Sequence, residues 1–339
     1  MADLGDPQTV NAARDDKWKA PLWQALEENG LTLAWVSDEF GGAGASMADG
    51  FDVLRISGQY AAPVALSETL LAGWLLAMSG QQCPSGPLAV APVRQRDKIT
   101  FGSDGTLSGS AKSVPFAKDA ARIVVAVPHN GSTIVAIVDP AKCAISERPH
   151  DMGGDRADVT FNGVAPEVVA ELGGGATYDT FWTLGAAARA AQMTGALESS
   201  LAIATQYSME RQAFGKLISK FQAVQHNLAQ LAGEVAASLA ASGSAIDTLQ
   251  NEPDNKAAVF LEVASAKIRV GEAARDGMAI AHQVHGAIGF TAEHVLQRYT
   301  RSLMGWRDDF GEEATWAVKL GTLIAEKGED ELWPMLTTR

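Results

Sequence analysis

Two short stretches of this 339-residue chain combine residue types that can bind a charged ligand. The first, ERQAFGKLISKFQ, contains Arg211, whose guanidinium can donate two hydrogen bonds to an oxyanion. The second, QVHGAIGF, runs from Gln283 to Phe290. A structural interpretation competes, because glycine after the last residue of a helical pattern often ends a helix. From the residues of the first stretch alone, Arg211 is best explained as a solvated cation at a helix end.

The order and spacing of these stretches resemble the signature regions of the flavin-dependent acyl-CoA dehydrogenases. That family carries R-x-x-F-G and F-Q, then Q-x-x-G-G-x-G-[FY] one helix hairpin later, and then R-x-x-R. The second glycine of the family's pair is Ala287 here, and His285 stands where an aromatic residue is usual. A packing or capping role explains that histidine best. The matching residues are Arg211, Phe214, Gly215, Phe221, Gln222, Gln283, Gly286, Ala287, Gly289, Phe290, Arg298 and Arg301.

The resemblance implies an FAD site at a subunit interface. In the family, residues at these positions reach the pyrophosphate and adenosine of an FAD whose ring lies in the neighbouring subunit. Glycine lets the backbone approach a phosphate closely. The resemblance also implies α,β-dehydrogenation of an acyl-CoA substrate and a flavoprotein electron acceptor. The expected cofactor-binding residues are Arg211, Phe214, Gln222, Gln283, Gly286 and Ala287.

The family's catalytic base has no counterpart at its usual positions. The reaction needs a carboxylate that removes a proton from the α carbon of the substrate. Most family members place a glutamate where Phe310 stands here, and a minority place it at the position of Gly185, which Ala186 follows in place of the usual arginine. The sequence therefore predicts no catalytic residue in this chain. Nearby acids, which a solvated cap explains better than a base, are Asp308, Asp309, Glu312 and Glu313.

The part of the family's site that holds the flavin ring also departs from the pattern. Members usually carry T-E-P-x-x-G-S-D and W-I-T segments in the β domain. The corresponding stretches here read LAVAPVRQRDKITFGSD and KSVPFAKDA. The tryptophan and threonine of the second segment correspond best to Val114 and Phe116. Neither residue replaces the group that would hold the ring.

This combination of retained and lost residues resembles the degenerate partner subunit of a two-chain, α2β2-type family member. The partner chain would supply the base and the ring site, while this chain would supply the adenosine half of the FAD site. Such two-chain members handle bulky steroid-type acyl-CoA substrates. One alternative is a self-sufficient homo-oligomeric dehydrogenase with an unusual acid such as Asp309 as the base. Another is a scaffold or assembly protein of the same fold without flavin.

Composition and charge are those of an ordinary soluble protein. Apolar residues make up 47% of the chain and charged residues 20%. The net charge of −13 argues against nucleic acid or an anionic membrane as a partner, since both need basic surface. Two distant cysteines, Cys83 and Cys143, argue against a disulfide scaffold. The sequence shows neither a signal peptide nor a membrane-spanning run, so a cytoplasmic location is expected.

Three regions of the chain, each with its own pattern of apolar residues, must position the two motifs. Apolar residues recur at helical spacing near the start, where Asn29-Gly30 closes one segment. Strand-like runs follow, and Asn130-Gly131 predicts a hairpin turn between two of them. Three long helical patterns then indicate an antiparallel bundle. The predicted α+β fold thus has a shortened N-terminal helical domain at 1–86, an antiparallel β-barrel domain at 87–172 and a four-helix bundle carrying the FAD motifs at 173–339.

Overall fold

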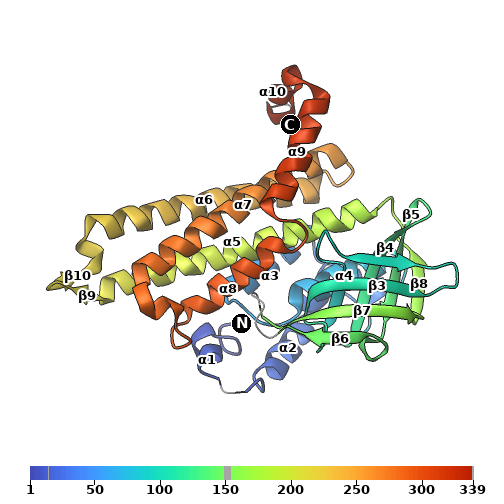
Figure 1. The fold of residues 1–339 in the computed structure, drawn as a ribbon, viewed down its shortest axis with the longest axis horizontal. Coiled ribbons are helices and arrows are strands. Elements are labelled where there is room, and N and C mark those ends of the chain that lie inside the picture. The colour runs from blue at the N-terminus through green and yellow to red at the C-terminus, as the bar shows by residue number, and fades with distance from the viewer. Residues whose placement is uncertain (14, 149–153, 338–339) are drawn as a thin grey trace.

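The computed structural model describes residues 1–13, 15–148 and 154–337. Helices form both ends of the described chain and strands form its middle, as the sequence predicts (Figure 1). Within these ranges, no helix is long and apolar enough to cross a membrane. Cys83 and Cys143 are both free thiols.

The N-terminal helices surround one that is apolar on nearly every side. In α4, all residues from Leu66 to Gly73 are buried, because the helix lies between the neighbouring helices and the β strands. The helix before it begins at Ser46, whose hydroxyl accepts a hydrogen bond from the Asp49 amide in a capping box. Gly30 closes α2 with a φ of +69°, as expected. The helices are α1 (Pro7–Ala12), α2 (Lys19–Glu28), α3 (Met47–Gln59) and α4 (Leu66–Met78), with short 3₁₀ turns at Leu31–Leu33 and Asp38–Phe40.

The middle of the chain forms two four-stranded sheets that pack against each other. One has the strand order β1-β4-β5-β8 and the other β2-β3-β7-β6. Alternate residues of the strands fill the core between the sheets, and β4 is buried on both faces from Ile123 to Val127. The strands are β1 (Leu88–Ala91), β2 (Lys98–Phe101), β3 (Leu107–Pro115), β4 (Arg122–His129), β5 (Ser132–Val138), β6 (Ala144–Glu147), β7 (Arg156–Val164) and β8 (Val168–Glu171).

The hairpin prediction is confirmed, and the strand pairs are antiparallel, as expected, with one exception. Asn130 and Gly131, both with positive φ, connect β4 to β5, and His129 pairs with Ser132. By contrast, β1 runs parallel to β4. A parallel pair needs a long crossover connection, which here contains β2 and β3 of the other sheet. The division at residues 86 and 172 into three domains stays a prediction.

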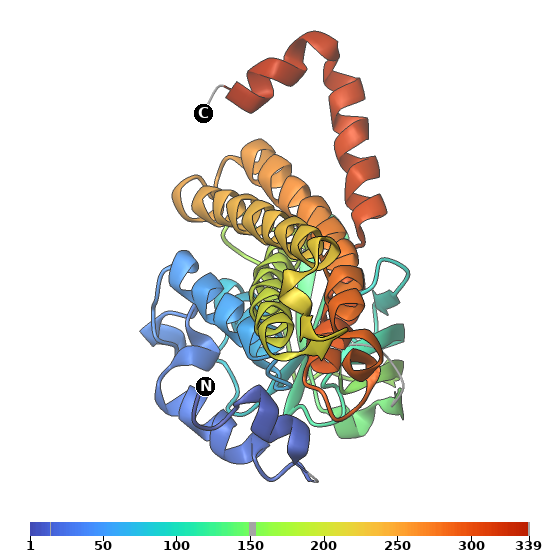
Figure 2. The same ribbon diagram turned by 90° about the vertical axis from the view of Figure 1, so that its left-hand side faces the viewer.

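The C-terminal part contains the three long helices that the periodicity predicts, followed by a shorter fourth. The long helices α5, α6 and α7 lie side by side in the bundle (Figures 1 and 2). Beyond the fourth helix, α9 and α10 project away from the bundle (Figure 2). The helices are α5 (Tyr178–Glu210), α6 (Gln222–Asn251), α7 (Lys256–His285), α8 (Leu296–Asp308), α9 (Glu313–Lys327) and α10 (Glu329–Thr337), with a 3₁₀ segment, η5, at Gly286–Phe290.

Glycines set how closely α3 and the central helix α5 approach. A Cβ atom added at Gly195 would stand 1.9 Å from the carbonyl oxygen of Arg55, and one added at Gly58 would stand 2.0 Å from that of Gln192. Real side-chain carbons do not come this close, so the two backbones touch at this crossing. The contact fixes α5 against the N-terminal helices, and α5 leads directly to the first motif.

Candidate cofactor half-site

The two motifs lie at the same end of the helical bundle (Figure 1). Tyr207 near the end of α5 stacks on His285 at the end of α7, with ring centroids 4.5 Å apart. Arg211 is one turn beyond that tyrosine, and Gly286 directly follows the histidine. His285 is buried in this contact, which confirms the packing role expected for it. Two segments that are distant in sequence are therefore held together by a stacked ring pair.

A strained hairpin presents the first motif. Helix α5 ends at Glu210 and Arg211 is its C-cap, so the helix stops before Phe214 and Gly215. The short strands β9 (Gln212–Ala213) and β10 (Lys216–Leu217) follow, joined by Phe214 and Gly215 with φ of +51° and +77°. Positive φ costs a phenylalanine about 1 kcal/mol or more, yet its side chain is 95% exposed. Among the described residues Phe214 has one ring contact, with Phe221 at a centroid distance of 6.3 Å, and most of its surface remains free to contact another molecule.

The second motif exposes its main chain at a glycine turn. Gly286 adopts φ +68° and ψ −148°, a combination that is essentially restricted to glycine. A Cβ atom added there would meet no atom within 4 Å, so the backbone at this turn faces open space. Gln283 and Ala287 beside it are exposed. Phosphate or another anion could therefore approach the main chain directly.

The polar side chains of both motifs are available for a ligand. Within the described ranges, Arg211 forms no ion pair, and the side-chain amides of Gln222 and Gln283 form no hydrogen bond. All three are exposed. A guanidinium, two amides, an exposed aromatic ring and an open glycine turn suit the pyrophosphate and adenosine of a dinucleotide. The six residues form a surface and not an enclosed pocket, so a second molecule would have to complete the site.

The two positions where the resemblance would place a catalytic glutamate contact each other. Phe310 is fully buried, and a Cβ atom added at Gly185 would stand 2.5 Å from its ring. Phe181 and Trp182 contact the same ring edge-on at centroid distances of 5.6 and 5.5 Å. The space that a carboxylate would need is therefore filled by aromatic carbon.

Asp309, the acid considered as an unusual base, is buried in an ionic cluster. Its carboxylate accepts hydrogen bonds from Arg156 at 2.9 Å for each oxygen and from Arg189 at 3.0 Å. Burial alone would raise the pKa of Asp309, but the guanidinium groups of Arg156, Arg189 and Arg94 hold it well below its ordinary value. A carboxylate with a low pKa and donors on both oxygens is a poor proton acceptor.

The sequence did not reveal the rest of this cluster. Arg189 also donates to Glu68 and, at 2.5 Å, to Gln192. A usable signal was present, because Arg189 stands within the alanine run AAARAAQ, where a central helix leaves no solvent-exposed face for it. Its acidic partners come from α4 and from the segment after α8, and no sequence pattern links those segments.

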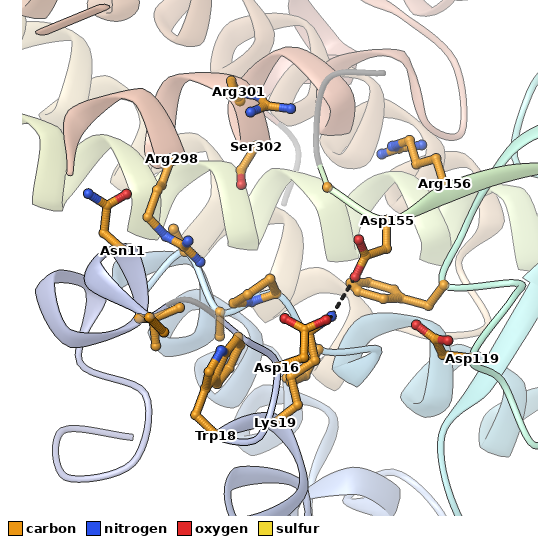
Figure 3. Close-up of a pocket in the computed structure, with 18 of the residues that line it drawn as sticks. Asn11, Asp16, Trp18, Lys19, Asp119, Asp155, Arg156, Arg298, Arg301 and Ser302 are labelled. Carbon is orange, nitrogen blue, oxygen red and sulfur yellow. Dashed lines mark hydrogen bonds and ion pairs between the residues drawn. The ribbon is translucent and has the colours of Figure 1, made fainter. Parts of the chain in front are cut away.

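In the β segment that corresponds to the family's ring-binding motif, one residue lies in the β core and the other lines a cleft. Val114 is fully buried in the β core. Phe116 has a φ of +54°, and its amide donates to the carbonyl of Asp155 at 2.8 Å. Its ring lines a cleft of about 680 Å³ between α1–α2, α8 and the β strands (Figure 3). Arg156 and Arg189 of the ionic cluster also line this cleft.

Comparison with known proteins shows which family the chain resembles. The family described as acyl-CoA dehydrogenase, C-terminal domain, matches residues 174–307. Acyl-CoA dehydrogenase IpdE2 of Mycolicibacterium smegmatis is 28% identical over 303 residues, covering 88% of this chain and 87% of its own. This chain is similar to acyl-CoA dehydrogenases over most of its length, and residues 174–307 match the C-terminal domain of that family.

Solved structures agree with the acyl-CoA dehydrogenase fold. The ChsE4-ChsE5 complex from Mycobacterium tuberculosis matches with a TM-score of 0.83 and 21% identity, covering 96% of this chain and 94% of the matched chain. The structure titled Tcur3481-Tcur3483 steroid ACAD G363A variant matches with a TM-score of 0.81 and 24% identity over the same shares. The fold class expected from the motifs is confirmed.

Proposed function

We propose that this chain is the non-catalytic partner subunit of an FAD-dependent acyl-CoA dehydrogenase built from two different chains. One observation carries the proposal. The residues proposed for the half-site are exposed at the bundle end, whereas the two positions for a catalytic glutamate hold Phe310 and Gly185, which pack against each other. A second chain would supply the base and the flavin-ring site.

The chain's own residues would act on the distal half of the cofactor. Arg211 would bind the pyrophosphate through its planar guanidinium, and Gly286 would let the backbone approach the same group. Phe214 and the amides of Gln222 and Gln283 would hold the adenosine. The chemistry that FAD would supply when bound is acceptance of a hydride from the β carbon of the acyl-CoA thioester. A flavoprotein electron acceptor would then reoxidise the complex.

The comparisons support a two-chain assembly and a bulky substrate. Two structures of similar fold carry titles that name two chains, and one of them is called a steroid ACAD. We extend both features to this chain, with an acyl-CoA of steroid type as the substrate. The competing homo-oligomeric dehydrogenase would need Asp309 as its base, and the burial of that residue among three arginines disfavours it.

The test is the flavin content of the purified protein. We would record the visible spectrum of this chain alone and after co-expression with a candidate dehydrogenase partner. We expect a colourless chain alone and a yellow, active complex. Arg211→Ala should lower the flavin content of the complex by about tenfold or more, since one charged hydrogen-bonding group is lost.

A matched control separates this effect from general charge loss. Arg275 is an exposed arginine of α7 that pairs with Asp276 at 2.8 Å. Arg275→Ala should leave the flavin content unchanged. A yellow and active homo-oligomer of this chain alone, or an Arg211→Ala complex with full flavin content, would contradict the proposal.

A further inference from the structure

The cleft shown in Figure 3 has two ends of different character. At one end, Asp16, Lys19, Asp119 and Asp155 lie together. At the other, Arg298 extends from α8 toward the interior of the cleft. The volume of about 680 Å³ is within the range of small-molecule sites. The cleft is separate from the surface that carries the FAD half-site residues.

Most cations of the cleft are neutralised by acids. Lys19 lies 2.7 Å from Asp155 and 2.9 Å from Asp16. Lys118 lies 2.7 Å from Glu147. The buried guanidinium groups of Arg156 and Arg189 share Asp309. These groups therefore have little remaining capacity to bind an anion.

Arg298 differs from all of them. Its Nε atom is buried without a hydrogen-bond partner, and the described residues provide no acid within ion-pair distance of its guanidinium. Burial lowers the pKa of Arg298, and Arg301 one turn further along α8 lowers it further. A partly buried cation without a counterion destabilises a folded protein unless a ligand supplies the missing charge.

The surroundings of Arg298 suit an apolar ligand with a single negative charge. The half-buried ring of Trp18 lies below it in Figure 3, and Ala61, Ala62 and Val64 provide buried apolar wall. The planar guanidinium fork matches a carboxylate. The acids at the opposite end would repel a more highly charged anion such as a phosphate dianion.

We propose that this cleft binds an organic carboxylate, with the carboxylate on Arg298 and the apolar body along Trp18 and the alanine wall. Arg301, which also lines the cleft, adds a second positive charge. The site would select small aromatic or alicyclic carboxylates over their neutral analogues. It is independent of the FAD half-site and could exist whether or not that proposal holds.

The test uses 1-naphthoate as the probe and the full chain, both alone and in its partner complex. Binding would be followed by calorimetry and by tryptophan fluorescence, since Trp18 and Trp306 line the cleft. We expect 1-naphthoate to bind and the neutral 1-naphthamide to bind about tenfold or more weakly. Arg298→Gln should weaken naphthoate binding by about 10–100-fold, and Arg298→Lys should restore part of it.

Arg275→Gln serves as the control and should bind naphthoate normally, because its ion pair lies on α7 outside the cleft. Arg301→Gln provides a second variant should Arg298→Gln fail to fold, and it should weaken binding less. Equal affinity for the neutral amide, or no loss in folded Arg298 or Arg301 variants, would overturn the proposal. Displacement of naphthoate by inorganic phosphate at lower concentrations would overturn the carboxylate assignment. Unchanged FAD content in Arg298→Gln would show that the two sites are distinct.

Discussion

Replacing Asp309 by asparagine separates a structural role of this acid from a catalytic one. The substitution keeps the shape of the side chain but removes the charge that three guanidinium groups share. Arg189 would retain Glu68 and Arg94 would retain Asp308 as partners. Arg156, whose side chain is fully buried, forms no ion pair with another acid of the described residues and would retain neutral acceptors such as the carbonyl of Ser113.

The magnitude follows from that uncompensated charge. Breaking a buried ion pair by removing one partner costs about 3–5 kcal/mol. For a chain of this length each kcal/mol shifts the Tm by roughly 1.4 °C, so the Tm should fall by at least about 4 °C. The neighbouring Asp308→Asn is the matched control, because that acid is largely exposed and pairs with Arg94 at the surface. Its cost should stay below about 1 kcal/mol.

The pH dependence gives an independent check. The folded pKa of Asp309 is depressed, so its contribution to stability is present above the unfolded value of about 4 and is lost as the pH falls further. Urea unfolding at pH 7 and pH 4 should therefore show a difference between the proteins that is largest at pH 7. An Asp309→Asn protein with wild-type stability but no activity in the complex would refute the structural role and identify this acid as the base.

Three further outcomes are expected. Gly185→Ala should lower the free energy of unfolding by about 1–3 kcal/mol, because its Cβ atom would stand 2.5 Å from the Phe310 ring. Its control is Gly233→Ala in α6, where an added Cβ atom would meet nothing. That variant should raise the free energy of unfolding by about 0.5–1 kcal/mol in the same urea titration. Burial lowers the pKa of Lys267 to about 7, so the unfolded state binds more protons between that pH and 10.5. The free energy of unfolding should therefore rise from pH 7 to pH 9, and the rise should be smaller in Lys267→Met. Phe214→Gly should leave stability unchanged or raise it by up to about 1 kcal/mol while lowering the flavin content of the complex, and loss of stability without loss of flavin would contradict the role given to this residue.

The long helices and the motif order were predictable because both depend on local pattern. Apolar periodicity gave α5, α6 and α7, and Asn130-Gly131 gave the β4–β5 hairpin. The exact ends of α5 and α6 were not predictable, because Phe214 takes a conformation that its residue type disfavours. Strain of this kind has no local sequence signal.

Contacts between distant segments were the part that sequence reasoning could not supply. The absence of a glutamate at Phe310 and Gly185 was read from spacing, but their direct contact comes from the packing of α5 on the segment after α8. The parallel pairing of β1 with β4 and the ionic cluster around Asp309 likewise join segments that share no sequence pattern. The sequence also gives no sign that the buried Nε of Arg298 lacks a hydrogen-bond partner.

The ratio of FAD to protein chains in the purified two-chain complex tests the central proposal most directly. If this chain supplies only the adenosine half-site, each pair of unlike chains should hold one FAD, and Arg211→Ala should remove it. Flavin absorbance against total protein gives the ratio. One FAD for every chain would mean that this chain also holds a flavin ring, and would contradict the account.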